Sequence, residues 1–149
     1  MYPVWLFLHV LAVAIWVGGM FFAHLCLRPA ALQLPPPQRL PLMADALGRF
    51  FGWVIVALVL LWLSGLAMMG SVGMAAAPIA WHLMLGIALL MTVVFAVIRG
   101  LRYPRLRASV AAQDWPAAGA ALNSIRLLVL VNLVLAMLTI AVATLGRYA

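Results

Sequence analysis

Long runs without a charged side chain constrain this sequence more than any other feature. Residues 4–27 and 50–98 contain no Asp, Glu, Lys or Arg. Only 7% of the chain is charged and 69% is hydrophobic, whereas about 25% of a soluble domain is charged. A run of about 20 apolar residues is long enough to cross a bilayer. The sequence therefore predicts an integral membrane protein.

Breaks in the apolar runs predict four spans. Arg28 and Pro29 are expected to end the first helix, and Gly70, Gly73 and Pro78 mark a turn within the second long run. We expect an all-α, four-helix transmembrane bundle that forms one domain over residues 1–149, with spans at about 4–27, 51–69, 79–98 and 125–145. Because no basic region precedes the first run, it is expected to be a retained span rather than a signal peptide.

The arginines predict the orientation of these spans. The chain has nine arginines and no lysine. Eight of them lie in or beside the first and third connections: Arg28, Arg39, Arg49, Arg99, Arg102, Arg105, Arg107 and Arg126. Because short basic connections stay in the cytoplasm, both termini are expected on the periplasmic side of a bacterial cytoplasmic (inner) membrane, as parts of a multi-pass protein. We assign the basic charge to contact with the lipid bilayer and expect no nucleic-acid partner.

The connections carry local signals of their own. In "QLPPPQRLP" the consecutive prolines predict an extended polyproline segment, and "LMADALGRF" predicts a short interfacial helix before the second span. Asp114 is expected to cap the fourth helix, with Pro116 in its first turn. These features are expected to be structural.

The ionisable residues exclude several kinds of enzyme. The only acids are Asp45 and Asp114, and there is no lysine, which excludes paired-carboxylate hydrolysis and lysine-based covalent catalysis. Cys26 is the single cysteine, so no intrachain disulfide can form. Whether the chain is an enzyme stays open, and a membrane oxidoreductase is the class that we retain.

The three histidines divide by depth in the predicted spans. His9 and His82 lie four or five residues from the outer ends of the first and third spans, so we expect them at the same depth in the outer leaflet. Ala12, Val13, Trp16 and Met20 follow His9 along one helical face. His24 is roughly 22 Å from His9 along the helix, in the other leaflet, where a structural role is favoured.

A first hypothesis is one b-type haem held between His9 and His82, because imidazoles from two facing helices hold haem in bundles. The chain would be a small membrane cytochrome in electron transport between a quinone or a redox partner protein and an outer acceptor, which copper could be. Arg147 would bind the haem propionates.

A second hypothesis is copper transport or resistance without haem. Met69 and Met74, at the outer end of the second span, would join His9 and His82 as ligands, because thioether sulfur and imidazole both bind copper. His24 would be an inner metal ligand, with Met20 and Cys26 beside it. A third hypothesis is a structural subunit of a redox complex. A homodimer through Gly/Ala faces is compatible with each hypothesis.

Short motifs in the spans resemble the copper-resistance protein D (CopD) family and the related HemJ-type protoporphyrinogen oxidases. They are His9, Trp16, Gly18-Gly19 and Phe21 in the first span, Trp81-His82 in the third and "IRLLVLVNLVLA" in the fourth. The resemblance implies a four-helix membrane bundle associated with copper handling or with haem and porphyrin redox chemistry. It also implies that His9 and His82 bind the prosthetic group or the metal.

Two departures favour the CopD-like side of this resemblance. HemJ-type enzymes carry a lysine two residues after the third-span histidine, where this chain has Met84. They also carry an Asn-Glu motif before the fourth helix, where this chain has Asn123-Ser124. Porphyrinogen oxidation is therefore not the expected activity.

Overall fold

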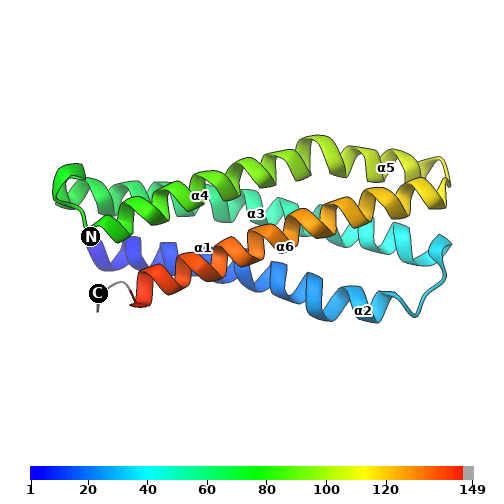
Figure 1. The fold of residues 1–149 in the computed structure, drawn as a ribbon, viewed down its shortest axis with the longest axis horizontal. Helices are drawn as coiled ribbons and strands as arrows, with labels where there is room; N and C mark the ends of the chain where they lie inside the picture. Colours follow the sequence, from blue (N-terminus) through cyan, green and yellow to red (C-terminus); the bar gives the residue numbers. More distant parts are fainter. Residues whose placement is uncertain (146–149) are drawn as a thin grey trace.

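The computed structural model describes residues 1–145, and within that range it consists of helices and short connections without strands (Figure 1). The elements are α1 Tyr2–Phe22, π-helix η1 Ala23–Leu27, α2 Arg28–Ala31, α3 Pro36–Val72, 3₁₀-helix η2 Met74–Ala76, α4 Ile79–Val97, π-helix η3 Ile98–Arg102, α5 Tyr103–Ala111 and α6 Trp115–Leu145. Four helical stretches in the described part are long and apolar enough to cross a membrane. The prediction of an all-α four-helix membrane bundle is thereby confirmed.

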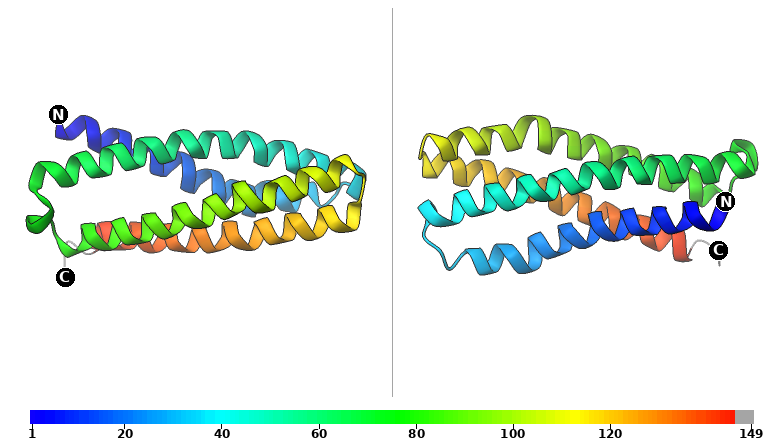
Figure 2. Two further views of the ribbon diagram at one scale, coloured as in Figure 1. Left: turned by 90° about the horizontal axis from the view of Figure 1, so that it is seen from above. Right: turned by 180° about the vertical axis from the view of Figure 1, so that it is seen from behind.

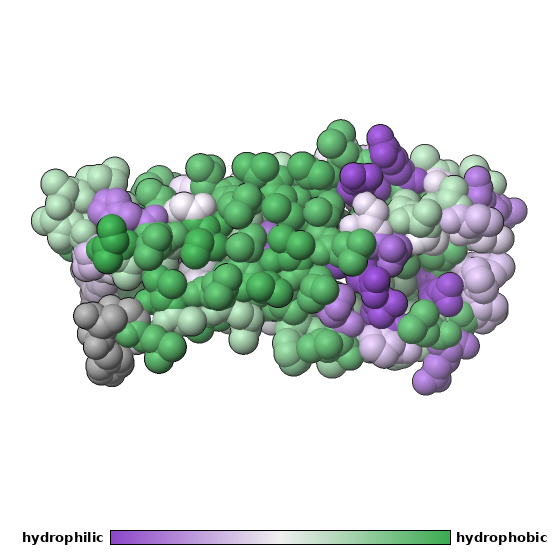
Figure 3. Space-filling model, in the orientation of Figure 1, coloured by the Kyte–Doolittle hydropathy of each residue, from purple (hydrophilic) through white to green (hydrophobic). Residues whose placement is uncertain are grey.

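The four long stretches run alternately up and down the bundle. α1 packs mainly on α3, and α4 packs mainly on α6 (Figure 2). The start of α1, η2 and the last turn of α6 lie at one end, here named the η2 end (Figure 1). α2, α5 and the connections at 32–35 and 112–114 lie at the other end, here named the arginine-rich end. Figure 3 shows hydrophilic residues gathered at the arginine-rich end and apolar residues over the middle of the bundle.

Every long stretch is longer than a hydrocarbon layer requires. α3 alone has 37 residues, which corresponds to roughly 55 Å at 1.5 Å per residue, against a layer of about 30 Å. The additional turns lie at the arginine-rich end. There, the Asp114 carboxylate accepts a hydrogen bond from the Ala117 amide at 3.1 Å. The predicted cap of the fourth helix is confirmed, and that helix begins at Trp115, ten residues before the predicted span.

Two expectations about prolines were wrong. Pro36 and Pro37 form the first turn of α3 instead of an extended segment, because a proline there lacks only an amide that would be unpaired anyway. Leu40 and Leu47 are buried, so packing favours helix from the outset. The first helical stretch also continues past Arg28 and Pro29 to Ala31 instead of ending there.

The same local structure, a short π-helix, precedes Pro29 and Pro104. A five-residue π-helix, η1 or η3, ends two residues before each proline, and each proline occupies the first turn of the next helix. A proline inside an α-helix clashes with the carbonyl four residues earlier, and a π-turn relieves such interruptions without ending the helix. Both stretches therefore continue beyond their prolines into the arginine-rich end.

Aromatic rings fill the core between the two ends. Phe51 packs edge-to-face on Phe95 and on Tyr103, with ring centroids 5.7 and 5.4 Å apart. Trp16, buried on the face of α1 predicted from His9, packs on Phe95 at 6.3 Å. The Tyr103 hydroxyl donates to the Ala44 carbonyl at 3.0 Å. Edge-to-face aromatic pairs stabilise a core beyond their buried area.

Candidate functional site

His9 lies on α1 against a small-residue patch of α3. Its Nδ1 lies 3.0 Å from the Ser64 hydroxyl oxygen. A Cβ atom on Gly65 would meet the His9 ring at 3.3 Å, so glycine leaves the imidazole the space that it occupies. Ser64 itself is fully buried. The bundle therefore holds this imidazole between two long helices.

The hydrogen bonds of Ser64 determine the tautomer of His9. The Ser64 hydroxyl donates to the Leu60 carbonyl at 2.6 Å, with the Leu61 carbonyl at 3.2 Å. Its proton is thus committed to its own helix, so its oxygen accepts from His9 and the Nδ1 atom of His9 carries the proton. The Nε2 atom keeps its lone pair, and no hydrogen bond to it is found among residues 1–145. This is the arrangement by which outer hydrogen bonds orient metal-binding imidazoles.

Buried sulfur lies one helical turn from this patch. Met68 and Met69 follow Ser64 and Gly65 by four residues, and both are buried. Side chains four residues apart lie above one another on a helix. Met74, in η2, is 59% exposed at the same end of the bundle. Of the predicted sulfur ligands, Met69 therefore lies on the side of α3 that contacts His9, and Met74 lies on the surface.

His82 is held separately, near the start of α4. Its Nδ1 donates to the Pro78 carbonyl of the preceding turn at 3.3 Å. Its Nε2 is therefore also free to accept. The described part of the chain contains no hydrogen bond between His82 and His9, and α1 and α4 each pack mainly on another helix. The two imidazoles therefore have separate hydrogen-bond partners.

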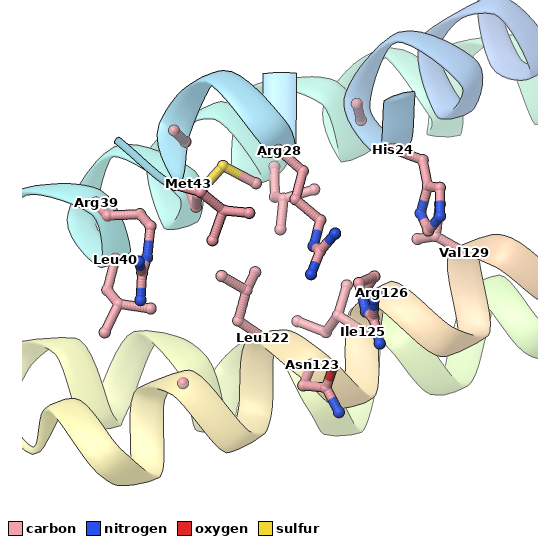
Figure 4. Close-up of a pocket in the computed structure, with 15 residues that line it drawn as sticks. His24, Arg28, Arg39, Leu40, Met43, Leu122, Asn123, Ile125, Arg126 and Val129 are labelled. Carbon is pink, nitrogen blue, oxygen red and sulfur yellow. The ribbon is translucent and has the colours of Figure 1, made fainter. Parts of the chain in front are cut away.

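His24 lies at the arginine-rich end, in η1. It lines a cavity of about 180 Å³ between η1, α2, α3 and α6, together with Arg28, Arg39 and Arg126 (Figure 4). Cys26 is exposed, whereas Met20 is buried. Around this cavity His24 therefore has three arginines as neighbours, together with the thioether of Met43.

Across residues 1–145, no group of three or more His, Cys, Asp and Glu side chains is arranged to hold a metal ion. Arg147, predicted as the partner of haem propionates, lies outside the described residues.

Two features were not predicted from the sequence. One is the contact of Ser64 with His9, and the other is the cavity lined by the three arginines. Ser64 had a signal: it is the only hydroxyl-bearing residue in the predicted second span, residues 51–69. The arginine cavity had none, because it joins positions from four helices. Asn132 joins two helices: its side-chain amide donates to the Met91 carbonyl at 3.1 Å.

Comparison with known proteins supports the copper side of the resemblance. No curated protein and no solved structure matches this chain. A family model, described as copper resistance protein D, matches residues 44–145. The matched region includes His82 and the three methionines near Ser64, while His9 and His24 lie before it. The likeness to HemJ-type oxidases stays a prediction. Because the match covers more than half of the chain, the protein belongs to the copper resistance protein D (CopD) family.

Proposed function

We propose that this protein binds Cu(I) as cargo at the η2 end of the bundle, through His9 Nε2 and the thioethers of Met68 and Met69. Membership of a family described as copper resistance protein D supports copper as the substrate. The observation that carries the site is the Ser64 hydrogen bond, which commits Nδ1 of His9 and leaves Nε2 free. Neutral imidazole and thioether sulfur together suit Cu(I).

The directions of the two helices support this ligand set. Side chains lean toward the N-terminus of their helix. α1 begins at the η2 end and α3 begins at the arginine-rich end, so His9 leans toward the η2 end while Met68 and Met69 lean back toward Ser64 and Gly65. These directions support a site in which the three side chains converge. Their burial removes water, which favours a soft, weakly hydrated ion over a hard one.

Met74 and His82 fit a role in capture at the surface. Met74 is exposed on η2, and His82 has a free Nε2 at the start of α4. By the positive-inside rule the η2 end faces the periplasm. Copper would reach Met74 or His82 first and then transfer to the buried set.

A second candidate keeps haem as the bound group. The free Nε2 atoms of His9 and His82 are each suited to bind iron, which favours bis-histidine ligation. Such ligation requires the two rings to meet between α1 and α4. Haem would add electron transfer with a quinone or a redox partner to the proposed function, and this cytochrome role remains the less supported of the two.

The deciding experiment is Cu(I) titration of purified protein against a chromophoric competitor, with oxidised and dithionite-reduced spectra of the same sample. We expect one tightly bound Cu(I), and an affinity roughly 10- to 100-fold lower in His9→Ala and in the double variant Met68→Leu/Met69→Leu. Met137→Leu is the matched control, because Met137 is 58% exposed on α6 and lies outside the proposed site.

The two candidates give different results in this experiment. Unchanged Cu(I) affinity in both His9→Ala and the methionine double variant would remove the proposed site. Sharp reduced α and β bands that disappear in His9→Ala and in His82→Ala would establish the haem candidate instead.

A further inference from the structure

The cavity at the arginine-rich end has a positively charged and apolar lining that the proposed copper site does not use. It has a volume of about 180 Å³ and is lined by η1 and α2 on one side and by α3 and α6 on the others (Figure 4). Most of its wall is apolar, including Leu40, Leu122 and Val129. Arg28, Arg39 and Arg126 supply its positive charge. This combination suits a ligand with an anionic group and an apolar portion.

The three arginines lack carboxylate partners. Within residues 1–145 the only salt bridge joins Arg49 to Asp45, and Asp114 caps α6. Arg28, Arg39 and Arg126 are half-buried, whereas Arg49, Arg105 and Arg107 are exposed. Like charges that are partly removed from water and share one cavity destabilise the folded state unless an anion joins them.

Arg126 provides a second, independent indication that the cavity binds an anion. Its Nε atom is buried and has no hydrogen-bond partner in the described part of the chain. Buried polar atoms are normally paired, so an unpaired guanidinium nitrogen beside a cavity indicates a missing acceptor. Figure 4 shows Arg28 from α2 and Arg126 from α6 extending into the same space between the helices. A guanidinium binds phosphate oxygens with two parallel hydrogen bonds.

We propose that this cavity binds a phosphate-bearing anion, with Arg28, Arg39 and Arg126 around the phosphate and the apolar wall against the remainder of the ligand. The phosphate can belong to the headgroup of an anionic phospholipid or to a soluble phosphate compound. The long helical extensions past the apolar part of the bundle place the cavity at the membrane boundary, where both are present.

The test is thermal unfolding of the full chain in detergent, followed by tryptophan fluorescence, with phosphatidylglycerol, phosphatidylcholine or inorganic phosphate added separately. We expect an anionic phosphate ligand to raise the midpoint temperature. Its half-saturating concentration should rise roughly tenfold or more in Arg126→Gln and in Arg28→Gln, because each loses charge-assisted hydrogen bonds to phosphate. Arg105→Gln is the matched control, since it removes the same charge from an exposed site at the same end.

A cavity-filling variant keeps the test decisive if an arginine variant does not fold. Gly119 lines the cavity, and a Cβ atom added there meets nothing within 4 Å. Gly119→Leu should therefore occupy the space, keep every charge and abolish the stabilisation by the ligand.

Each outcome has one meaning. Stabilisation by phosphatidylglycerol alone, lost in the cavity variants and kept in Arg105→Gln, assigns a lipid headgroup. The same dependence with inorganic phosphate assigns a soluble compound. Equal losses in cavity and control variants, or no stabilisation by either ligand, would overturn the proposal.

Discussion

At the scale of single residues, Ser64 sets the orientation of the His9 imidazole. It is fully buried in α3, donates its proton to its own helix and accepts from His9. A serine placed in this way holds the imidazole in one orientation and one tautomer, which would lower the entropy cost of ordering a ligand at the proposed copper site. The orientation of the His9 ring is therefore set by a residue on another helix.

Ser64→Ala tests this dependence. We expect Cu(I) affinity to fall roughly tenfold, because His9 loses its orienting hydrogen bond while the proposed ligands stay present. Ser71→Ala is the control: Ser71 also bonds a carbonyl of its own helix, that of Met68, and makes no hydrogen bond to a histidine. Equal affinities for Cu(I) in the two variants would show that Ser64 does not position the imidazole.

At the scale of elements, close approach of α1 to α3 supports the site. A Cβ atom on Gly19 would collide with the Phe50 ring of α3, whereas one on Gly18 would meet nothing within 4 Å. The Gly18-Gly19 pair thus contains one residue that the packing requires and one that it does not. Small residues at helix contacts allow backbones to approach in membrane bundles.

Substituting the two glycines separates these roles. Gly19→Ala should lower the free energy of unfolding by about 1–3 kcal/mol, the usual cost of overpacking. Gly18→Ala should leave it within roughly 1 kcal/mol of wild type, because its added methyl group has open space. Reversible unfolding in mixed detergent micelles measures both. Equal destabilisation by the two substitutions would contradict the assigned contact.

At the scale of the whole molecule, the charged residues and the proposed copper ligands lie at opposite ends of the bundle. The eight arginines of residues 1–145 lie toward the arginine-rich end, and the proposed copper ligands lie toward the η2 end. Between them the core is closed by buried rings such as Trp16 and Phe51. The two proposed binding sites are therefore at opposite ends of one bundle.

Cysteine labelling tests the orientation of this bundle. In a Cys26→Ala background, we expect a membrane-impermeant thiol reagent to label Ala75→Cys, on exposed η2, in intact cells whose outer membrane is opened. Ala112→Cys, in the exposed α5–α6 connection, should react only after the inner membrane is permeabilised. The reverse pattern would invert the topology and place the proposed copper site on the cytoplasmic side.

The sequence by itself was enough to predict the class of fold, because apolar length and helical periodicity are local properties that the bilayer selects strongly. It also located Asp114 as a cap, since a cap depends on its own segment. The helical prolines were missed because packing and π-turns outweigh the local preference of proline.

Only the tertiary structure decided which residues share a site. It brought His9 to Ser64, across 55 positions of sequence, and joined three arginines from separate helices around one cavity. The histidines at equal predicted depth, His9 and His82, have separate partners. The depth of a residue along a helix follows from counting residues. Which residues it contacts depends on which helices pack together, and side-chain fit between elements distant in the chain determines that packing.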